Sequence, residues 1–378
     1  MIYLDNAAST RILPEVIQEL VKSCEEYYGN PSSIHSAGQK AKKLLENSRE
    51  VIAGLFGAEG KEIIFTSGGA EGNNLVIKGA AEAYAYKGKH IITTDIEHPT
   101  VLNTLLDLEE KGYEITYLHT DKNGLINVEE LKDSLRQDTI LVSVMSSNNE
   151  TGVIQPIEEI GKILSKTAVF FHVDAVQSIG KDIIYPKESR ISAFTASAHK
   201  FYGPKGAGIV FLDKNFLVKK QIFGGHQERN RRAGTENLNS VYGMQKALEI
   251  IYGSIFQEQM NEKRLHEYME KRIKNEINDV VINGEEADRL NTITSLTIRG
   301  CDVQTLLVAL DLRGICVSAG SACMSGAFLE SPVLKAMGLS KEDLKSTIRV
   351  SIGRYNTMEE IDFFIENLNE MGKTERGE

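Results

Sequence analysis

Two stretches of this chain decide the fold: HVDAVQ at residues 172–177 and SAHKFYGPKG at residues 197–206. Asp174 directly follows the apolar run 169–173, and we expect Lys200 to lie at the end of a neighbouring strand. Similar β-branched runs occur at residues 62–66, 90–94, 114–118 and 140–145. Amphipathic helical patterns, such as residues 41–56, separate most of these runs. This alternation predicts an α/β fold with a mostly parallel, helix-covered sheet.

Polar residues follow several of the predicted strands. They are Asp174, Asn149, the pair at residues 97–98 and the segment at residues 67–69. In sheets of this type, ligands bind at the carboxyl ends of the strands. We therefore expect these residues to gather around one site.

Lys200 and Asp174 point to the chemistry of that site. Either residue alone would mean little, because lysine is usually a solvated surface residue and an aspartate after a strand is often a helix cap. Together they are the two anchors that a pyridoxal phosphate (PLP) enzyme needs: a lysine for the Schiff base and an acid for the pyridinium nitrogen. The pair therefore predicts PLP as the cofactor.

A phosphate handle is predicted at residues 67–73, where a glycine-rich turn follows a strand and opens a helix. Backbone N–H groups at a helix N-terminus can hold a dianion, although an ordinary tight turn has the same composition. The turn lacks a Walker lysine and a GxGxxG pattern, which disfavours a nucleotide. Ser197 and His199 can supply further donors. Thr235, at another expected helix start, is either a further contact or a simple helix cap.

The composition limits the classes of function. The chain has 378 residues and a formal net charge of −10. This charge argues against a general nucleic-acid or anionic-membrane binder. No apolar run approaches the ~18 residues of a membrane span, and the first residues lack the pattern of a signal peptide. We expect a cytoplasmic enzyme.

The length indicates two lobes, because one hydrophobic core rarely serves so long a chain. After a helical region near residues 238–277, the pattern changes to strands at 292–298, 315–317 and 347–352 and helices at 303–312 and 358–368. We predict a large PLP-binding domain at residues 15–255. Residues 1–14 and 256–378 would form a smaller α+β domain.

The four cysteines are Cys24, Cys301, Cys316 and Cys323. Their spacing forms neither a disulfide framework nor a metal-ligand pair, so we expect reduced thiols and no metal site. Cys24 and Cys316 fit the pattern of small buried apolar residues. Cys323 differs, because residues 318–327 are a run of small residues without a periodic apolar face, which indicates a loop.

Several ordered motifs together resemble the NifS/IscS type of cysteine desulfurase. The resemblance extends from Tyr3 to beyond Arg354, and its motifs lie at residues 5–8, 28–35, 148–152, 172–177, 198–206, 234–237 and 320–323. It implies a fold-type I PLP enzyme of the class V aminotransferase superfamily with a seven-stranded sheet. Such an enzyme works as a homodimer that converts L-cysteine to L-alanine and an enzyme-bound persulfide.

The resemblance also implies roles in cofactor binding. Lys200 would carry PLP in the Schiff base, Asp174 would face the pyridine nitrogen, and His98 would stack on the ring. Gln177 and Asn149 would contact the ring oxygen or the substrate. The phosphate contacts would come from Gly69, Ala70, Ser197, His199 and, from the partner subunit, Thr235. At Ala70 the chain departs from many relatives, which have threonine, so one hydroxyl contact is expected to be missing.

Substrate binding and catalysis follow from the same resemblance. Arg349, Asn149 and Asn30 would bind the substrate, with the planar guanidinium of Arg349 on its carboxylate. Cys323 would be the nucleophile that accepts the sulfur, and Lys200 would move protons, with His98 as a further catalytic residue.

Three questions stay open at this stage. A selenocysteine lyase or a transaminase has the same fold, although a transaminase needs no thiol such as Cys323. A noncatalytic sulfur-carrier scaffold would not need Lys200 and Asp174. The long segment between Cys323 and Pro332 resembles the IscS/NifS group and favours delivery to several acceptor proteins. The acceptor could be an iron–sulfur scaffold, a tRNA-thiolation enzyme or a thiamin-pathway protein.

Overall fold

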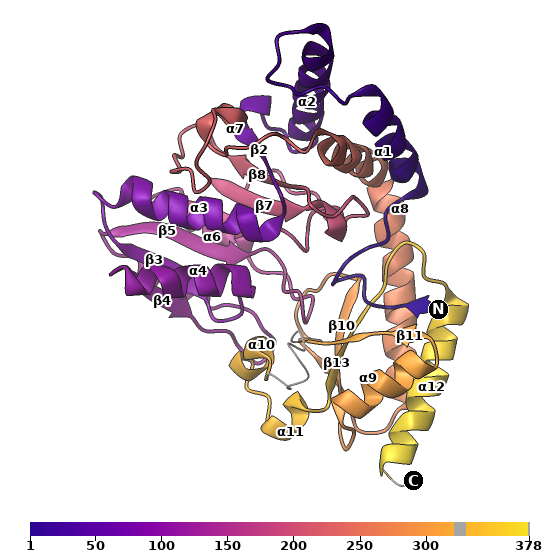
Figure 1. Cartoon of the computed structure of the whole chain (residues 1–378). Helices are drawn as coiled ribbons and strands as arrows, with labels where there is room; N and C mark the ends of the chain where they lie inside the picture. Colours follow the sequence, from indigo (N-terminus) through magenta and orange to yellow (C-terminus); the bar gives the residue numbers. More distant parts are fainter. Residues whose placement is uncertain (321–329, 377–378) are drawn as a thin grey trace.

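A seven-stranded sheet forms the centre of the larger part of the molecule (Figure 1). The computed structural model describes residues 1–320 and 330–376 of the chain. The strand order is β2-β8-β7-β6-β5-β3-β4, and β8 alone runs antiparallel to its neighbours. The prediction of a mostly parallel α/β sheet is therefore confirmed. The strands are β2 Ile63–Thr66, β3 His90–Thr94, β4 Glu114–Leu118, β5 Thr139–Met145, β6 Phe170–Asp174, β7 Ala193–Ser197 and β8 Gly208–Leu212.

Helices cover both faces of this sheet because alternate strand residues are apolar on both sides. In β5, Leu141 packs with α3 and α4, whereas Val142 and Val144 pack in the core that contains residues of α1, α2, α6 and α8. The helices of this part are α1 Pro14–Glu26, α2 Ser36–Leu55, α3 Gly69–Tyr84, α4 Pro99–Glu110, α5 Val128–Ser134, α6 Ile157–Leu164 and α7 Gln227–Asn230.

A smaller antiparallel sheet, in the order β12-β13-β10-β9, has its own apolar core with α9 and α12. The 39-residue helix α8 (Leu238–Glu276) contributes to both cores and is continuous through residue 255. The domain division at that residue stays a prediction. The remaining elements are β1 Ile2–Tyr3, β9 Val280–Asn283, β10 Ile293–Ile298, α9 Val303–Leu312, β11 Ile315–Cys316, β12 Ser318–Ala319, α10 Pro332–Ala336, α11 Lys341–Leu344, β13 Thr347–Ser351 and α12 Met358–Arg376.

The N-terminal segment crosses from the smaller part to the larger one (Figure 1). Strand β1 pairs with β11 in parallel, and Asp5 forms a bridge with Ser351 at the end of β13. Thr10 then donates a hydrogen bond to the carbonyl of His199 before α1 begins. Residues 5–10 therefore lie between the two sheets, close to Lys200.

Some sequence expectations differ from the structure. Helix α2 begins at Ser36 rather than at residue 41, because the His35 side chain caps it by accepting a hydrogen bond from the amide of Gly38. Cys24 is exposed, so its interpretation as a buried apolar residue was wrong; it lies on the outer side of α1. Cys301 is buried, and Cys316 is partly buried.

The described ranges contain neither a candidate membrane-spanning helix nor a candidate metal cluster. None of the helices in residues 1–320 and 330–376 combines the length and the apolar character needed to cross a membrane. Within the same ranges, no three His, Cys, Asp or Glu side chains group in a way that could hold a metal ion.

Candidate active site

A cavity of about 240 Å³ lies at the carboxyl ends of the parallel strands. This edge is where the parallel topology brings together the residues that follow each strand. Nine of the residues predicted from the sequence line the cavity: Gly69, Ala70, His98, Asn149, Asp174, Gln177, Ser197, His199 and Lys200. The structure therefore places most of the predicted cofactor contacts around one space.

Asp174, the last residue of β6, presents a carboxylate with two fixed hydrogen bonds. The amide of Val176 donates to Oδ1 at 3.0 Å, and Nδ2 of Asn73 donates to Oδ2 at 2.7 Å. Asp174 and Asn73 are both buried. Donors directed at both oxygens suit the ionised form of the carboxyl group, which is the form needed beside a protonated ring nitrogen.

His98 has a defined tautomer. The amide of Thr100 donates to Nδ1 of His98 at 3.1 Å, so in the neutral ring Nδ1 is the acceptor and Nε2 carries the proton. The hydroxyl of Thr100 also contacts Nδ1, at 2.8 Å. Burial lowers the pKa of His98, and the charge of Lys200 lowers it further against the opposing effect of Asp174. A neutral imidazole in this position can stack on an aromatic cofactor ring.

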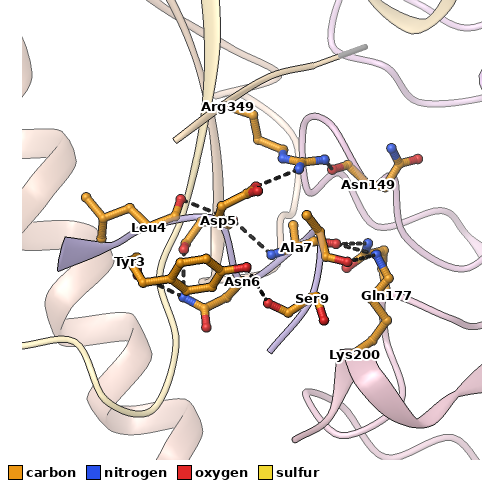
Figure 2. A network of polar contacts seen from close by, with 12 residues as sticks. Tyr3, Leu4, Asp5, Asn6, Ala7, Ser9, Asn149, Gln177, Lys200 and Arg349 are labelled. Carbon is orange, nitrogen blue, oxygen red and sulfur yellow. Dashed lines mark hydrogen bonds and ion pairs between the residues drawn. The ribbon is translucent and has the colours of Figure 1, made fainter. Parts of the chain in front are cut away.

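Lys200 reaches toward the N-terminal segment (Figure 2). Its Nζ donates to the carbonyl of Ala7 at 2.5 Å and to that of Ala8 at 3.0 Å. Burial lowers the pKa of Lys200 to about 8; the positive charge of Arg349 adds to this effect, and the carboxylates of Asp174 and Asp5 oppose it. The amine is therefore nucleophilic at a lower pH than an exposed lysine.

Arg349 of β13 is buried and holds two partners from distant segments. Nη1 donates to the carbonyl of Asn149 at 3.0 Å, and Nη2 donates to Oδ1 of Asp5 at 2.9 Å. Figure 2 shows this junction between the smaller sheet, the loop after β5 and the N-terminal segment. Nε of Arg349 is a buried donor without a partner among the described residues. A guanidinium with an unused N–H group can bind a carboxylate ligand.

A second hollow, of about 450 Å³, continues from the cavity to the N-terminus of α3. Ser197, His199 and Lys205 line it together with residues 67–71. Burial lowers the pKa of His199 to about 4, and the charges of Lys200, Lys205 and Lys181 add to this effect. The first-turn N–H groups of α3, two hydroxyl or imidazole donors and a lysine form a set that fits a phosphate dianion. The residues present therefore fit the cofactor predicted from the sequence.

Within the described ranges, three predicted residues do not line the cavity: Arg349, Asn30 and Thr235. Among the described residues, Asn30 is exposed and accepts a hydrogen bond from the amide of Ser32. Thr235 is also exposed and does not line the cavity; the helix after it is capped by the side chain of Asn237. Cys323 lies outside the described residues.

Four residues that support the site were not predicted from the sequence: Asp5, Asn73, Thr100 and Lys181. Asp5 and Asn73 belong to motifs noted in the sequence, but their partners Arg349 and Asp174 are more than 100 positions away. Thr100 follows His98 by two residues, and His98 is the N-cap of α4, whose side chain accepts a hydrogen bond from the amide of Thr100. Lys181 follows Gln177 by four residues, and its contacts depend on a turn that no pattern indicated.

Known proteins resemble this chain over almost its whole length. Residues 2–364 match the family model Aminotransferase class-V. A cysteine desulfurase of Trichormus azollae is 43% identical over 371 residues, which are 98% of this chain and 92% of that protein. The cysteine desulfurase IscS of Dictyoglomus turgidum is 41% identical, covering 97% and 93%. A solved structure described as a NifS-like protein superposes with a TM-score of 0.92 at 35% identity, covering 98% of each chain.

These matches confirm the resemblance, the fold-type I architecture, the dependence on PLP and the enzyme class predicted from the sequence. The chain belongs to the class V aminotransferase family.

Proposed function

We propose that this protein is a PLP-dependent cysteine desulfurase, which removes the sulfur of L-cysteine and leaves L-alanine. One observation carries the proposal: Lys200, Asp174, His98 and an anion-binding helix start surround one cavity. The matched relatives named cysteine desulfurase support the reaction type.

The residues around the cavity would hold the cofactor as follows. The start of α3, Ser197 and His199 would bind the phosphate, Asp174 would face the ring nitrogen, and His98 would cover the ring. Bound PLP supplies an electron sink for the substrate carbon atoms. The two hydrogen bonds on Asp174 fix its carboxylate, which would pair with the ring nitrogen.

The substrate carboxylate would bind Arg349 beside Asn149. Nε of Arg349 is buried and unpaired among the described residues, and a carboxylate would satisfy it. Asp5 and the carbonyl of Asn149 hold the guanidinium in place before substrate arrives, which reduces the ordering cost of binding.

Sulfur transfer requires a thiol nucleophile, and we assign this role to Cys323. Its thiolate forms a bond to the substrate sulfur while the carbon–sulfur bond breaks. The carbon keeps the electron pair and takes up a proton to become the methyl group of alanine. Lys200 is the proton carrier, because its lowered pKa, about 8, lets the amine accept and return a proton near neutral pH.

We also infer a homodimer in the cytoplasm. The exposed residues Ser67, Ala70 and Lys205 line the phosphate hollow, and the partner's Thr235 would complete it, with the partner's Asn30 near the substrate. The persulfide sulfur would pass to an acceptor protein, either an iron–sulfur scaffold or a tRNA-thiolation enzyme. The name IscS of a close relative is in accord with this kind of partner. Nucleic acid and membranes are not expected to bind directly.

The test is alanine formation from L-cysteine by the purified protein loaded with PLP. The wild type and a Cys24→Ala control should form alanine, because Cys24 lies on the outer side of α1. Cys323→Ala should not form it with multiple turnovers. A wild-type protein that binds PLP but consumes only L-selenocysteine would instead establish the alternative, a selenocysteine lyase.

A further inference from the structure

Lys181 clamps the side chain of Gln177, one of the residues that line the cavity. Nζ of Lys181 donates to the backbone carbonyl of Gln177 at 2.8 Å and to its side-chain Oε1 at 3.1 Å. At the other end of the amide, Nε2 of Gln177 donates to the carbonyl of Ala7 at 3.0 Å. Gln177 is buried, so its amide has few alternative partners.

These contacts fix which way the amide points. A lysine nitrogen carries at least two N–H groups whether it is charged or neutral, and the two oxygens of Gln177 match them. The amide oxygen must therefore face Lys181, and the NH₂ group must face Ala7 and the cavity, as Figure 2 shows for the Ala7 side. The carbonyl of Ala7 is shared, because Lys200 also donates to it. The hydrogen bond from Lys181 to Oε1 of Gln177, by contrast, is not shared with Lys200.

The surroundings of Lys181 favour its hydrogen bonds to Gln177. Burial lowers its pKa, and the charges of Lys200 and Arg349 lower it further, whereas Glu262 opposes them. Lys181 and the buried Glu262 of α8 line a separate cavity of about 170 Å³. The backbone of Lys181 is held as well, since its carbonyl accepts a hydrogen bond from Gln259 of α8 at 2.9 Å. The backbone of Lys181 is therefore held by α8, and its side-chain amine donates hydrogen bonds to Gln177.

We propose that Lys181 is a positioning residue that keeps the N–H group of Gln177 directed at the ring oxygen of the bound cofactor. This inference rests on the proposed function, because it assumes that PLP occupies the cavity. An N–H donor stabilises negative charge on the ring oxygen, whereas a reversed amide would place its own oxygen there. Lys181 does not touch the cofactor and acts through Gln177.

The experiment is a double-mutant cycle on PLP binding to the apoprotein, with Lys181→Met, Gln177→Leu and the double variant. One hydrogen bond contributes about 0.5–1.5 kcal/mol, which is roughly 2–13-fold in affinity. We expect each single variant to bind PLP weaker by a factor in this range, and the double variant to be no weaker than Gln177→Leu. Lys181→Arg, which keeps the donors, should bind like the wild type. Lys166→Met, which removes an exposed lysine, is the matched control.

A second readout excludes a purely structural effect. The pH midpoint of the visible absorption change of the bound cofactor should move upward in Lys181→Met and Gln177→Leu alike, since charge on the ring oxygen loses a donor. It should stay in place in Lys181→Arg and Lys166→Met. Additive losses in the cycle, or an unmoved midpoint in Lys181→Met, would overturn the inference. Failure of the wild type to bind PLP would instead overturn the proposed function.

Discussion

Nδ2 of Asn73 lies 2.7 Å from Oδ2 of Asp174 and 2.9 Å from the hydroxyl of Thr100. The hydroxyl of Thr100 in turn contacts Nδ1 of His98 at 2.8 Å. One buried amide on α3 therefore connects the carboxylate at the end of β6 with the imidazole at the start of α4. These are the groups assigned to the ring nitrogen and the ring face of the cofactor, so Asn73 sets their relative position.

Replacing Asn73 by leucine should weaken PLP binding by about tenfold or more. The change removes a hydrogen bond to a charged group, which contributes about 1.5–3 kcal/mol. Titration of the apoprotein with PLP measures the effect. Asn74→Leu is the control, because Asn74 donates to the carbonyl of Ala70 in its own helix rather than to Asp174. Equal PLP affinity of Asn73→Leu and the wild type would show that Asn73 does not support the site.

The amine of Lys200 should react with acetic anhydride in the apoprotein with an apparent pKa of about 8. Burial, aided by the charge of Arg349, disfavours the protonated form, so the neutral amine becomes available at lower pH than in a model peptide, where the pKa is about 10.4. Mass spectrometry of the peptide that contains Lys200, labelled over a range of pH, gives the value. A labelling curve that follows the model peptide would contradict the lowered pKa.

Arg49 and Glu228 form a buried, bidentate ion pair with N–O distances of 2.7 and 2.8 Å. Glu228 has a φ of 45°, in the left-handed region, so the pair holds a strained turn that leads toward Thr235. Arg49→Met should lower the free energy of unfolding by about 3–5 kcal/mol, because it leaves an unpaired buried carboxylate.

Urea unfolding at one fixed protein concentration measures this loss. Arg229→Met is the control, since its ion pair with Glu46 is exposed and should contribute less than about 1 kcal/mol. Similar losses for the two variants would contradict the account of the buried pair.

Glu270 should make stability depend on acidic pH. Burial acts to raise the pKa of Glu270, but the contact with His266 and the hydrogen bonds from Arg289 outweigh it and bring the pKa to about 2, against an ordinary value of 4.5. Because this pKa is lower in the folded state than in the unfolded state, ionised Glu270 stabilises the fold at pH values above about 4.5. This stabilisation is lost as the pH falls from about 4.5 toward 2. The contribution is on the order of 3 kcal/mol.

The free energy of unfolding should therefore differ most between the wild type and Glu270→Gln near pH 6, and the difference should narrow below pH ~4.5. Urea unfolding at several pH values tests this. Glu286→Gln, at an exposed ion pair with Lys122, should show little change. A difference between wild type and Glu270→Gln that stays constant over this pH range would contradict the prediction.

Much of the larger sheet could be predicted from the sequence, because β-branched runs mark buried parallel strands. The bounds of strand β7 were missed, although a strand that ends before Lys200 was expected, because its residues Ala193–Ser197 are mostly small and lack that signal. Strand β8 was also missed, although Gly208–Leu212 is apolar, since a short apolar run alone does not separate strand from helix. The order of the strands depends on long-range pairing that no local pattern encodes.

Some residues of the site could be predicted from the sequence, and others could not. Residues that follow parallel strands, such as Asp174 and Asn149, could be expected to meet, because the topology brings those strand ends to one edge. The role of Asp174 beside the ring nitrogen followed from its pairing with Lys200, whereas the role of Asn149 came from the resemblance to a known family. The contacts of Arg349 with Asp5 and of Lys181 with Gln177 could not be predicted, because they depend on how the N-terminal segment and one turn pack. The assignment of Cys323 as the nucleophile is based on its sequence motif alone.

The central claim is that L-cysteine is split into alanine and a sulfur atom held on Cys323. The most direct measurement is a single turnover of the PLP-loaded protein with substoichiometric L-cysteine and no reductant, followed by quantification of alanine and mass spectrometry of the peptide that contains Cys323. We predict alanine equal to the cysteine consumed, with the mass of one extra sulfur on that peptide. Alanine formed without added sulfur on Cys323, or pyruvate in place of alanine, would contradict the account.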